Sequence, residues 1–482
     1  MKETNSKNVL LTAIGIVVIV VASFVSYSTS FGNEFLFDDI SQIVNNDVIK
    51  SPGNISAVFT HHLTFFTRNN QEEGKFYRPL QSITLMLDHL LWGMETFGYH
   101  LTNTLLHALV GVLSFLFLLS VTKNTAVSFI TSLLYAVHPI HTEAVTYISG
   151  RADSLCAVFL FLIALSRIRY YKSISIAGRA FSYFFIMVFF ICALLSKEYS
   201  MVFPLLLVWL GYCFDAETGY SSQANRKIFF YLPFFAIIAV WFFIKNAIVS
   251  TETMVEEPGS LATRLTTMPR LIFDYVRLSF FPTGLHMGYK LEFPRSLLQT
   301  GYLGPFIFTM IFLGASYYVW FKGKTDFYYK IAAFGLGWFF IGLAPYLNLV
   351  FQLNAPFAEH WLYVPEMGLI LSVVVLLYSK IKDVPWAKKI GMVLAIAVTV
   401  IFLHKTMEQN KVWKDSFTFY SYTVKYADYS ETIYNNLAIE YVKMQRWDDA
   451  EKAFMKALEI NPDYKVARDN LENMRRDNRR GI

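Results

Sequence analysis

The sequence contains few cysteines and few charged residues. Three of its 482 residues are cysteine, and Cys156, Cys192 and Cys213 all lie in apolar runs, so they indicate neither a disulfide framework nor a thiolate zinc site. Charged residues make up 16% of the chain, whereas 55% of the residues are hydrophobic and 17% aromatic, and the mean hydropathy is +0.39. A soluble core does not require so apolar a composition, so the sequence predicts a protein that crosses a membrane many times.

Motifs for nucleotide chemistry are also absent. The sequence has no phosphate-binding loop, dinucleotide-binding fingerprint or cytoplasmic Asp-x-Asp pair, which argues against direct use of a nucleoside triphosphate or a nucleotide sugar. The net charge of +6 and the pI of about 8.9 would suit a nucleic-acid partner. The basic residues fall instead in short clusters between apolar runs, where the positive-inside rule places them, so we expect no nucleic acid to bind.

Apolar runs of bilayer length predict about eleven transmembrane helices, and hence an all-α membrane body over residues 1–405. The first run, 9–27, follows Lys2 and Lys7 and precedes no small-residue cleavage pattern, so we expect a retained helix with a cytoplasmic amino end. The other runs cover residues 97–121, 125–139, 152–166, 181–195, 201–214, 229–250, 302–321, 327–350, 361–378 and 390–403.

Alternate connections between these helices carry the basic clusters, which assigns those connections to the cytoplasm. The clusters are Lys123; Arg167, Arg169, Lys172 and Arg179; Arg226 and Lys227; Lys322 and Lys324; and Lys380, Lys382, Lys388 and Lys389. Two of the opposite, trans connections are long, covering residues 28–96 and 251–301. The first contains an amphipathic stretch, 77–92, that suits a helix lying along the membrane interface. The second contains residues 271–281, whose pattern fits a re-entrant or a surface-lying segment equally well.

Residues 406–482 form a separate C-terminal domain with the spacing of paired soluble helices. Within 431–464, the apolar positions match a complete tetratricopeptide repeat of about 34 residues. Residues 413–426 are expected to form a degenerate preceding helix, and residues 465–475 a capping helix. Because about three repeats are normally needed for stability, we expect this tail to dock on the membrane body or on a partner. An odd number of spans places the tail on the trans side. The repeat positions are Tyr434, Leu437, Ala438, Tyr441, Ala450, Phe454, Ala457 and Pro462.

Asp38 and Asp39 lie about ten residues beyond the first span, at the height of the lipid headgroups. Adjacent carboxylates repel each other, so one of them is expected to have a raised pKa and to serve as a general base. We slightly favour Asp39. The alternative is a turn or a helix cap without a catalytic role.

The segment from His138 to Glu143 is a second cluster, followed by Arg151 and Asp153. Two imidazoles three residues apart and a carboxylate are able to ligate a metal, although Pro139 breaks the helix that would aim them together. A structural cluster of Glu143, Arg151 and Asp153, or a polar site that orients a substrate, is the alternative. We therefore assign no metal ligand.

Two further polar segments face the trans side. Lys197 and Glu198 occupy a tight turn, which a solvated connection would also explain. Glu359, His360, Trp361 and Tyr363 lie where the chain enters a late span, and the imidazole there would contact a lipid phosphate. An aromatic belt at the membrane interface is the alternative explanation for Trp361 and Tyr363.

Taken in order, these motifs resemble the polytopic GT-C glycosyltransferases, and within them the transmembrane, tetratricopeptide-containing O-mannosyltransferase-like branch. The resemblance extends over nearly the whole chain. It is carried by Phe37-Asp38-Asp39, Tyr77-Arg78-Pro79-Leu80, Gly98-Tyr99-His100, His138-Pro139 with His141-Thr142-Glu143-Ala144-Val145, Gly150-Arg151-Ala152-Asp153, Ser196-Lys197-Glu198 and residues 359–365.

The resemblance implies an inverting transferase that moves a sugar from a polyprenyl-phosphate carrier to an acceptor hydroxyl of a protein or glycan on the trans side. Asp38 or Asp39 would be the general base. No cofactor follows from the resemblance, and a divalent metal is possible but not indicated. In this reading Glu143, Arg151 and Asp153 shape the sugar or acceptor site, Arg78, Lys197 and His360 neutralise the carrier phosphate, and Glu198, Glu359 and Tyr363 complete the substrate-binding candidates.

The sequence departs from this branch at two points. His360 stands where an arginine is common, so phosphate binding there is expected to weaken or to depend on pH. The repeat array is much shorter than in animal members, which favours a bacterial cytoplasmic membrane with the catalytic loops and repeat on the outer or periplasmic side. The main alternative function is a noncatalytic scaffold that recruits partners through its repeat, and a transporter is the third. Transfer from a radiolabelled lipid-linked sugar would separate the first two.

Overall fold

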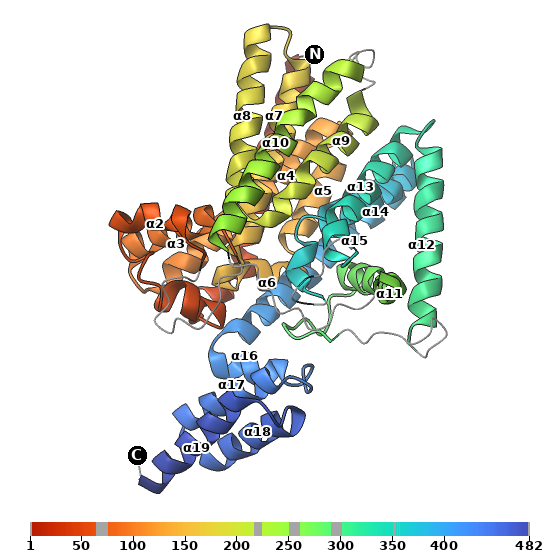
Figure 1. Ribbon diagram of the computed structural model, residues 1–482. Coiled ribbons are helices and arrows are strands. Elements are labelled where there is room, and N and C mark those ends of the chain that lie inside the picture. The colour runs from red at the N-terminus through yellow and green to blue at the C-terminus, as the bar shows by residue number, and fades with distance from the viewer. Residues whose placement is uncertain are drawn as a thin grey trace.

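The computed structural model describes residues 2–63, 76–215, 224–249, 261–290, 301–349, 353, 355 and 357–480. The described residues form helices and connecting turns, with no strand among them (Figure 1). Most of the helices run side by side in one bundle, and a small group of helices at the C-terminus projects from one end of it (Figure 1). The predicted fold class, an all-helical multi-pass membrane protein with a short helical repeat tail, is confirmed.

Eight helices in the described part are long and apolar enough to cross a membrane. Three shorter helices, α5, α9 and α14, lie in the same bundle (Figure 1), so each predicted span corresponds to a helix. The eight long helices are α1 (Lys2–Tyr27), α4 (Thr96–Thr122), α7 (Arg151–Lys172), α8 (Ile176–Ser196), α10 (Ala224–Ile248), α12 (Leu303–Lys322), α13 (Phe327–Leu343) and α15 (Pro385–Asn410), and the shorter three are α5 (Thr125–Ala136), α9 (Phe203–Phe214) and α14 (Glu366–Ile381).

The bundle has an inner and an outer set of helices. In the most apolar window of α7, 78% of the residues are buried, whereas only 6% are buried in α15. The inner helices approach closely at small residues: a Cβ on Gly335 of α13 would lie 2.4 Å from the carbonyl oxygen of Gly368 in α14. Small residues at such crossings let helix backbones pack without a hydrophobic driving force from water. The apolar side chains of α15 are left to face lipid.

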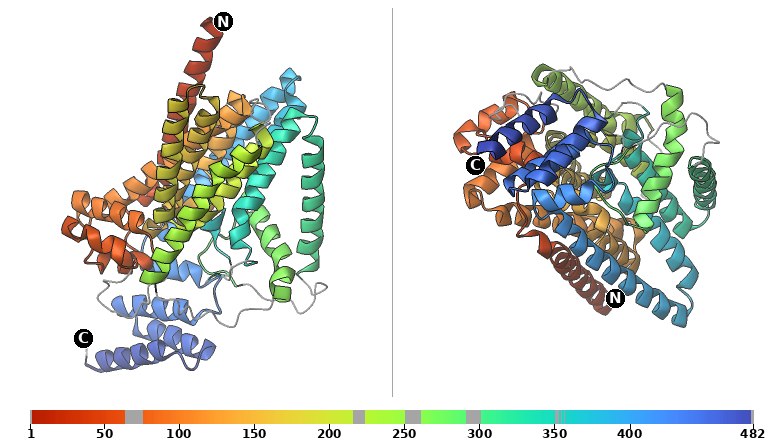
Figure 2. Two further views of the ribbon diagram at one scale, coloured as in Figure 1. Left: turned by 45° about the horizontal axis from the view of Figure 1, so that its top comes forward. Right: turned by 90° about the horizontal axis from the view of Figure 1, so that it is seen from below.

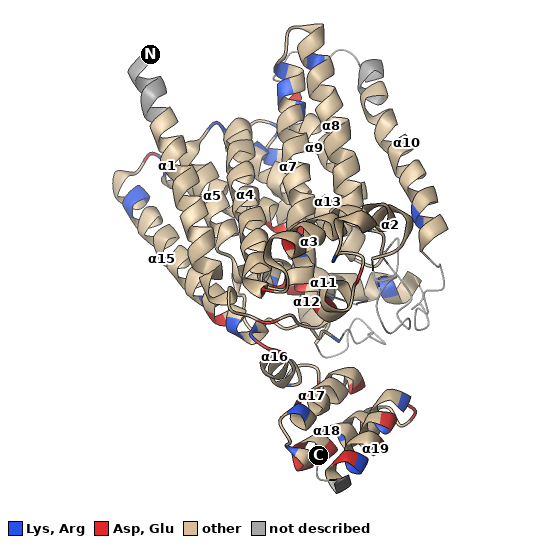
Figure 3. Cartoon of the chain, turned by 90° about the vertical axis from the view of Figure 1, so that its left-hand side faces the viewer, with Lys and Arg blue, Asp and Glu red and all other residues tan. Residues whose placement is uncertain are grey.

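Several helix boundaries differ from the sequence-based prediction: α13 ends at Leu343, for example, and α15 runs from Pro385 to Asn410. Two of the differences involve charged residues inside the bundle. The run predicted to end at residue 166 continues to Lys172, and Arg167, predicted to be part of a cytoplasmic cluster, is buried against Asp215 at 2.9 Å. The run predicted from residue 361 becomes regular only at Glu366, after a 3₁₀ turn over Glu359–Leu362. Figure 3 shows Lys and Arg at the bundle end near the N-terminus and a band of Asp and Glu toward the tail.

The described parts of the two long connections that are predicted to lie on the trans side contain helices outside the upright bundle. The first holds α2 (Ile55–Thr60) and α3 (Pro79–Trp92), and α3 leaves Leu87, Leu90 and Leu91 more than half exposed, as a helix at a membrane interface would. The second holds α11 (Leu261–Phe280), which begins ten residues before the predicted stretch and lies across the end of the bundle (Figures 1 and 2). This orientation favours the surface-lying interpretation. Glu252, Glu256 and Glu257 of the second connection lie outside the described residues.

The tail consists of α16 (Ser416–Thr423), α17 (Glu431–Lys443), α18 (Trp447–Ile460) and α19 (Lys465–Arg480). Small buried residues, Ala438 on α17 and Ala450 and Ala457 on α18, allow the two central helices to pack closely around Phe454. This is the helical hairpin that the repeat spacing predicts. α15 continues through the short 3₁₀ turn Lys411–Trp413 into α16, so the tail starts directly beneath the bundle (Figure 1).

Candidate active site

The first trans loop carries two adjacent aspartates in different environments. Asp39 is 1% exposed, and its carboxylate accepts hydrogen bonds from the backbone N–H of Leu36 (3.1 Å) and from the backbone N–H and hydroxyl of Ser149 (2.8 and 2.5 Å). Asp38 is exposed, and its backbone N–H donates to the hydroxyl of Tyr147 (3.0 Å). Asp39 therefore ties the first loop to the segment before α7, whereas Asp38 is accessible.

The environment of Asp39 changes its ionisation. Burial raises the pKa of Asp39 to about 7, although the hydrogen bonds from Ser149 and Leu36 lower it in part, and the charge of Asp38 raises it further. The aspartate with the raised pKa is thus Asp39, whose carboxylate accepts the three hydrogen bonds. Phe37, immediately before the pair, has φ of +49°, a left-handed conformation that costs a non-glycine residue about 1 kcal/mol or more.

Glu143 and His360 connect two trans turns that are far apart in sequence. Nδ1 of His360 lies 2.8 Å from Oε1 of Glu143, and the backbone N–H of His360 donates to Oε2 (3.0 Å). Burial alone would raise the pKa of Glu143, but the charge of His360, the hydrogen bonds from it and the nearby Lys197 outweigh burial and lower the pKa. Glu143 is therefore ionised at neutral pH.

Glu359, the residue before His360, has the opposite tendency. Its Oε1 accepts hydrogen bonds from the hydroxyl of Tyr289 (2.5 Å) and the backbone N–H of His286 (2.6 Å). Burial and the charge of Glu143 raise the pKa of Glu359 well above its usual value. Two neighbouring carboxyl groups at this face thus differ in ionisation, an arrangement typical of sites that carry out acid and base chemistry.

Two further ion pairs link the first loop, α7 and the turn after α8. Arg78 holds Glu198 in a bidentate contact, Nε to Oε2 at 3.0 Å and Nη2 to Oε1 at 2.5 Å, and Lys197 lies 2.6 Å from Asp153. Burial would raise the pKa of Glu198, but Arg78 outweighs it and holds that pKa at about 2. The alternative interpretation of this turn as a solvated connection is wrong, because Lys197 is only 4% exposed.

The ion-pair partner of Arg151 is neither Glu143 nor Asp153, with which the sequence grouped it. Its guanidinium is fully buried, lies 2.6 Å from Asp88 of α3 and donates to the carbonyl oxygen of Tyr99 (3.3 Å). Glu143, Arg151 and Asp153, expected to form one cluster, thus have three different partners. Arg151 therefore joins the start of α7 to α3 and α4.

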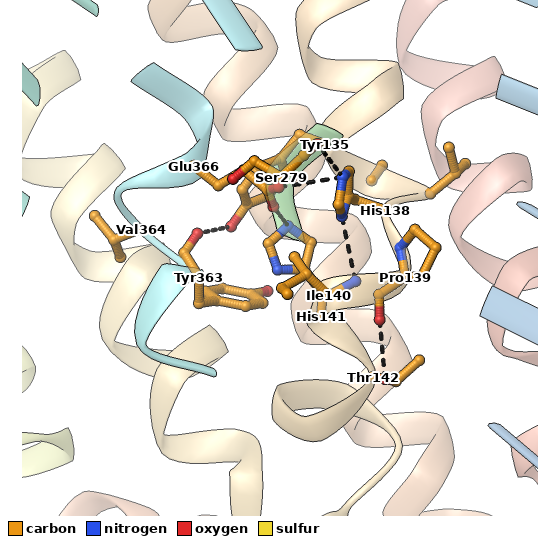
Figure 4. Close-up of polar contacts among 12 residues, drawn as sticks. Tyr135, His138, Pro139, Ile140, His141, Thr142, Ser279, Tyr363, Val364 and Glu366 are labelled. Carbon is orange, nitrogen blue, oxygen red and sulfur yellow. Dashed lines mark hydrogen bonds and ion pairs between the residues drawn. The ribbon is translucent and has the colours of Figure 1, made fainter. Parts of the chain in front are cut away.

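The two histidines of the motif both face Glu366 at the start of α14 (Figure 4). Nε2 of His138 lies 3.2 Å from Oε1 of Glu366 and Nε2 of His141 lies 3.1 Å from Oε2, and all three side chains are fully buried. Nε2 of His138 also lies 3.0 Å from the carbonyl oxygen of Ser279, while its Nδ1 accepts from the N–H of Ile140. His138 therefore carries its proton on Nε2, which is not the form that ligates a metal at that atom. In the described part of the chain, no group of three or more His, Cys, Asp or Glu residues is placed to hold a metal ion.

Aromatic rings fix the turn that carries His360. Tyr199, Tyr346 and Trp361 form a parallel stack, with centroids 5.1 and 4.8 Å apart and planes at 7° and 3°. Trp361 is 8% and Tyr363 1% exposed, so the aromatic-belt interpretation of these two residues is wrong. The Tyr363 hydroxyl instead lies 2.7 Å from Nδ1 of His107 inside the bundle.

Sequence reasoning missed several residues that complete these contacts, among them Asp88, Tyr147, Tyr289 and Glu366. Glu366 directly follows the motif 359–365 and was the nearest to being found. The other three belong to segments without a recognised motif, and only tertiary contacts reveal them.

Together, the fold and these contacts define a class: a multi-pass helical membrane protein with paired acidic and basic side chains at one face, and a helical repeat beside that face. Residues 432–464 match the tetratricopeptide repeat family model. Over 464 residues the chain is 23% identical to protein O-mannosyl-transferase F38B6.6 of Caenorhabditis elegans, covering 93% of this chain and 63% of that protein. It is 26% identical over 490 residues to protein O-mannosyl-transferase TMTC3 of Homo sapiens, covering 95% and 52%.

The resemblance to transmembrane, tetratricopeptide-containing O-mannosyltransferases is thereby confirmed, and the chain spans between half and two thirds of the length of these relatives. Among solved structures, the crystal structure of ArnT from Cupriavidus metallidurans bound to undecaprenyl phosphate matches with a TM-score of 0.42 and 13% identity, covering 96% of this chain and 76% of that chain.

Proposed function

We propose that this protein is an inverting membrane glycosyltransferase of GT-C type, which moves a sugar from a polyprenyl-phosphate donor to an acceptor hydroxyl on the trans side. The observation that carries the proposal is the accessible Asp38 on a turn that Tyr147 and, through Asp39, Ser149 hold in place. The names of the relatives support mannose as the sugar and a protein as the acceptor.

In this proposal Asp38, rather than Asp39, is the general base. The Asp39 carboxylate already accepts three hydrogen bonds and is buried, so an acceptor hydroxyl cannot reach it without breaking them. The Asp38 carboxylate takes the proton of the acceptor hydroxyl as that oxygen attacks the anomeric carbon. The bond from the anomeric carbon to the carrier phosphate breaks, and the phosphate leaves with the bonding electrons. A single displacement of this kind inverts the anomeric configuration.

The leaving phosphate gains negative charge, which nearby cations stabilise. Arg78, Lys197 and His360 are the proposed cations. Each is already paired with a carboxylate, and the His360 side chain is 25% exposed whereas that of Lys197 is 5% exposed. We therefore propose His360 as the first contact of the phosphate, with Arg78 and Lys197 setting the positive potential behind it.

The remaining candidates hold these groups in place. Glu143 and Glu359 orient the His360 turn, and Glu198 and Asp153 orient Arg78 and Lys197. Arg151 and Tyr363 act from buried positions. The site would face the trans side, which in a bacterial cytoplasmic membrane is the outer or periplasmic side; the basic clusters in the opposite connections support this orientation.

The test is sugar transfer by the purified full chain in lipid nanodiscs, with radiolabelled polyprenyl-phosphate mannose and a hydroxyl-containing peptide. We expect label to move to the peptide, with inverted configuration by NMR. The double variant Asp38→Asn with Asp39→Asn is the control and should bind donor but not transfer. If the wild type does not consume any of several polyprenyl-phosphate sugars while its tail still binds a protein, the scaffold function replaces this proposal.

A further inference from the structure

The segment that begins the tail packs on the loop that carries Asp38. Trp413 is 3% exposed and its ring stacks on that of Tyr147, with centroids 5.3 Å apart and planes at 23°. Phe419 on α16 is 1% exposed and lies 4.9 Å from Trp413 and 6.4 Å from Phe37, between ring centroids. The two rings of the membrane body that the tail contacts both lie next to Asp38. Phe37 precedes Asp38 in the chain, and the hydroxyl of Tyr147 accepts the backbone N–H of Asp38.

Backbone contacts join the same two segments. The N–H of Glu34 in the first loop donates to the carbonyl oxygen of Lys414 (2.9 Å). Leu36 and Tyr147 from the membrane body share one buried cluster with residues of the tail, which we call the loop–tail cluster. Its buried members are Leu36, Tyr147, Trp413, Phe419, Tyr420 and Leu437.

Asn410, the last residue of α15, fixes the point where the tail starts. Its side-chain NH₂ donates to the carbonyl oxygen of Ser26 (2.8 Å) and the hydroxyl of Thr29 (3.0 Å), and its side-chain oxygen accepts from Thr146 (2.6 Å). Its backbone carbonyl accepts from the side chain of Asn33 (3.0 Å). The end of α1, the segment before Tyr147 and the start of the tail therefore meet at one fully buried amide.

The turn that these contacts hold is strained. Phe37 has a positive φ of +49°, which an aromatic residue rarely adopts. A residue persists in such a conformation only when its surroundings over-determine it, and residues of this kind concentrate at functional sites. The surroundings of Phe37 include Phe419 of the tail.

We infer that the 3₁₀ turn Lys411–Trp413 and α16 together form a positioning element for the Asp38 turn: Trp413 on the turn and Phe419 on α16 hold Phe37 in the left-handed conformation that presents Asp38 to the acceptor. This inference rests on the proposed function and adds a role for the tail that does not depend on recruiting an acceptor. A tail that only recruits would alter the KM for a protein acceptor and leave transfer to a small hydroxyl compound unchanged. A tail that positions Asp38 alters both.

The first experiment measures how stably the Asp38 turn is held and does not depend on enzyme activity. We would measure hydrogen exchange of the amides of residues 34–44 in nanodiscs for wild type, Phe419→Ala and the matched control Phe417→Ala. Phe417 lies on the same helix and packs at the edge of the loop–tail cluster, where its ring contacts Tyr441 of the tail at 5.6 Å, so it controls for the loss of an aromatic ring that does not contact Phe37 in the way Phe419 does. Phe419→Ala should speed exchange at Asp38 about tenfold or more, and Phe417→Ala should not. Equal exchange in all three proteins would overturn the inference, whatever their activity.

The second experiment measures catalysis with acceptors of two sizes. With a short hydroxyl peptide as acceptor, Phe419→Ala and the milder Phe419→Leu should lower kcat by about tenfold and about threefold, with donor KM unchanged, because the base is displaced. Phe417→Ala should retain wild-type kcat. A loss confined to the KM of a folded protein acceptor would show recruitment only and refute the positioning role.

A double-variant cycle tests the part played by strain. Glycine adopts positive φ readily, so Phe37→Gly relaxes the turn and removes the ring that Phe419 contacts. Phe419→Ala should then cost little further activity in the Phe37→Gly background, although it costs about tenfold alone. Independent, multiplying losses would contradict the inference. Absence of transfer by the wild type would count against the proposed function alone, since the exchange experiment still decides the positioning role.

Discussion

Substituting Asp38 and Asp39 separately should affect different properties of the protein. Asp39 accepts three hydrogen bonds in a buried place, whereas Asp38 is exposed. A hydrogen bond contributes about 0.5 to 1.5 kcal/mol, and a buried donor left without a partner costs about 1 to 3 kcal/mol. Asp39→Ala should therefore lower the free energy of unfolding by about 3 kcal/mol or more, and Asp39→Asn, which keeps an acceptor for Ser149, by about 1 to 2 kcal/mol.

Asp38→Asn should leave stability within about 0.5 kcal/mol of wild type, as expected for an exposed substitution. It should nevertheless slow transfer by about a hundredfold or more, because the amide cannot take the acceptor proton. Unfolding is followed in mixed micelles by fluorescence, and transfer by initial rates with labelled donor at saturating concentration.

The outcome depends on which variant loses rate without losing stability. If Asp38→Asn transfers normally and Asp39→Asn is inert yet as stable as wild type, then the buried aspartate is the base and the accessibility argument is refuted. Donor affinity should stay unchanged in both variants, which separates loss of the base from loss of the binding site.

Four further predictions follow from the same contacts. A cysteine replacing Ser416 should react with an impermeant thiol reagent from the trans side, and one replacing Ser173 should be protected in intact cells; reversed labelling would overturn the topology. Burial raises the pKa of Asp39 to about 7 in the folded protein, whereas the pKa of an aspartate in the unfolded chain is about 3.9. The contribution of Asp39 to stability is therefore full below about pH 3.9 and falls as the pH rises to about 7. Asp39→Asn should flatten the pH dependence of the unfolding free energy over this interval. His360→Ala should raise donor KM, because the carrier phosphate loses a hydrogen-bond donor, and His360→Arg should raise it less, because the guanidinium supplies a fixed positive charge, as KM measurements on both variants would show. Arg151→Met should lower the free energy of unfolding by about 3 to 5 kcal/mol, because the buried Asp88 loses its charged partner. Unfolding in mixed micelles measures this loss, and the folded fraction of the variant should keep the wild-type donor KM.

Local patterns predicted the helices well because their causes are local. The repeat was found from the spacing of Tyr434, Leu437, Ala438 and Phe454. Tyr434, Ala438 and Phe454 meet between α17 and α18, whereas Leu437 packs in the loop–tail cluster. The spans were found from the length of their apolar runs. Arg167 shows the limit of this reasoning: a charged residue ended the predicted helix, but its partner Asp215 lies in another element and lets the helix continue.

The partners within the site were not predictable, because they join segments distant in sequence. Glu143 meets His360, 217 residues away, and Tyr147 meets Trp413 of the tail. The motif grouped Glu143 with Arg151 and Asp153, whereas the fold turns the three in different directions. Positive φ at Phe37 has no sequence signature either, since glycine or asparagine would be the expected residue at such a position.

The buried ion pairs favour the proposed transferase over the noncatalytic scaffold. Replacing a buried ion pair with apolar residues is often neutral or stabilising, so pairs such as Lys197 with Asp153 are poor devices for stability alone. A scaffold that only holds the tail would need the loop–tail cluster, which is mainly apolar and aromatic, and would gain nothing from buried cations beside it. A transferase does need them, because a phosphate that leaves with two electrons requires fixed positive charge close to an accessible base. The coexistence of both features therefore supports the proposed transferase over the scaffold, and it agrees with the inferred role of the tail in positioning the base.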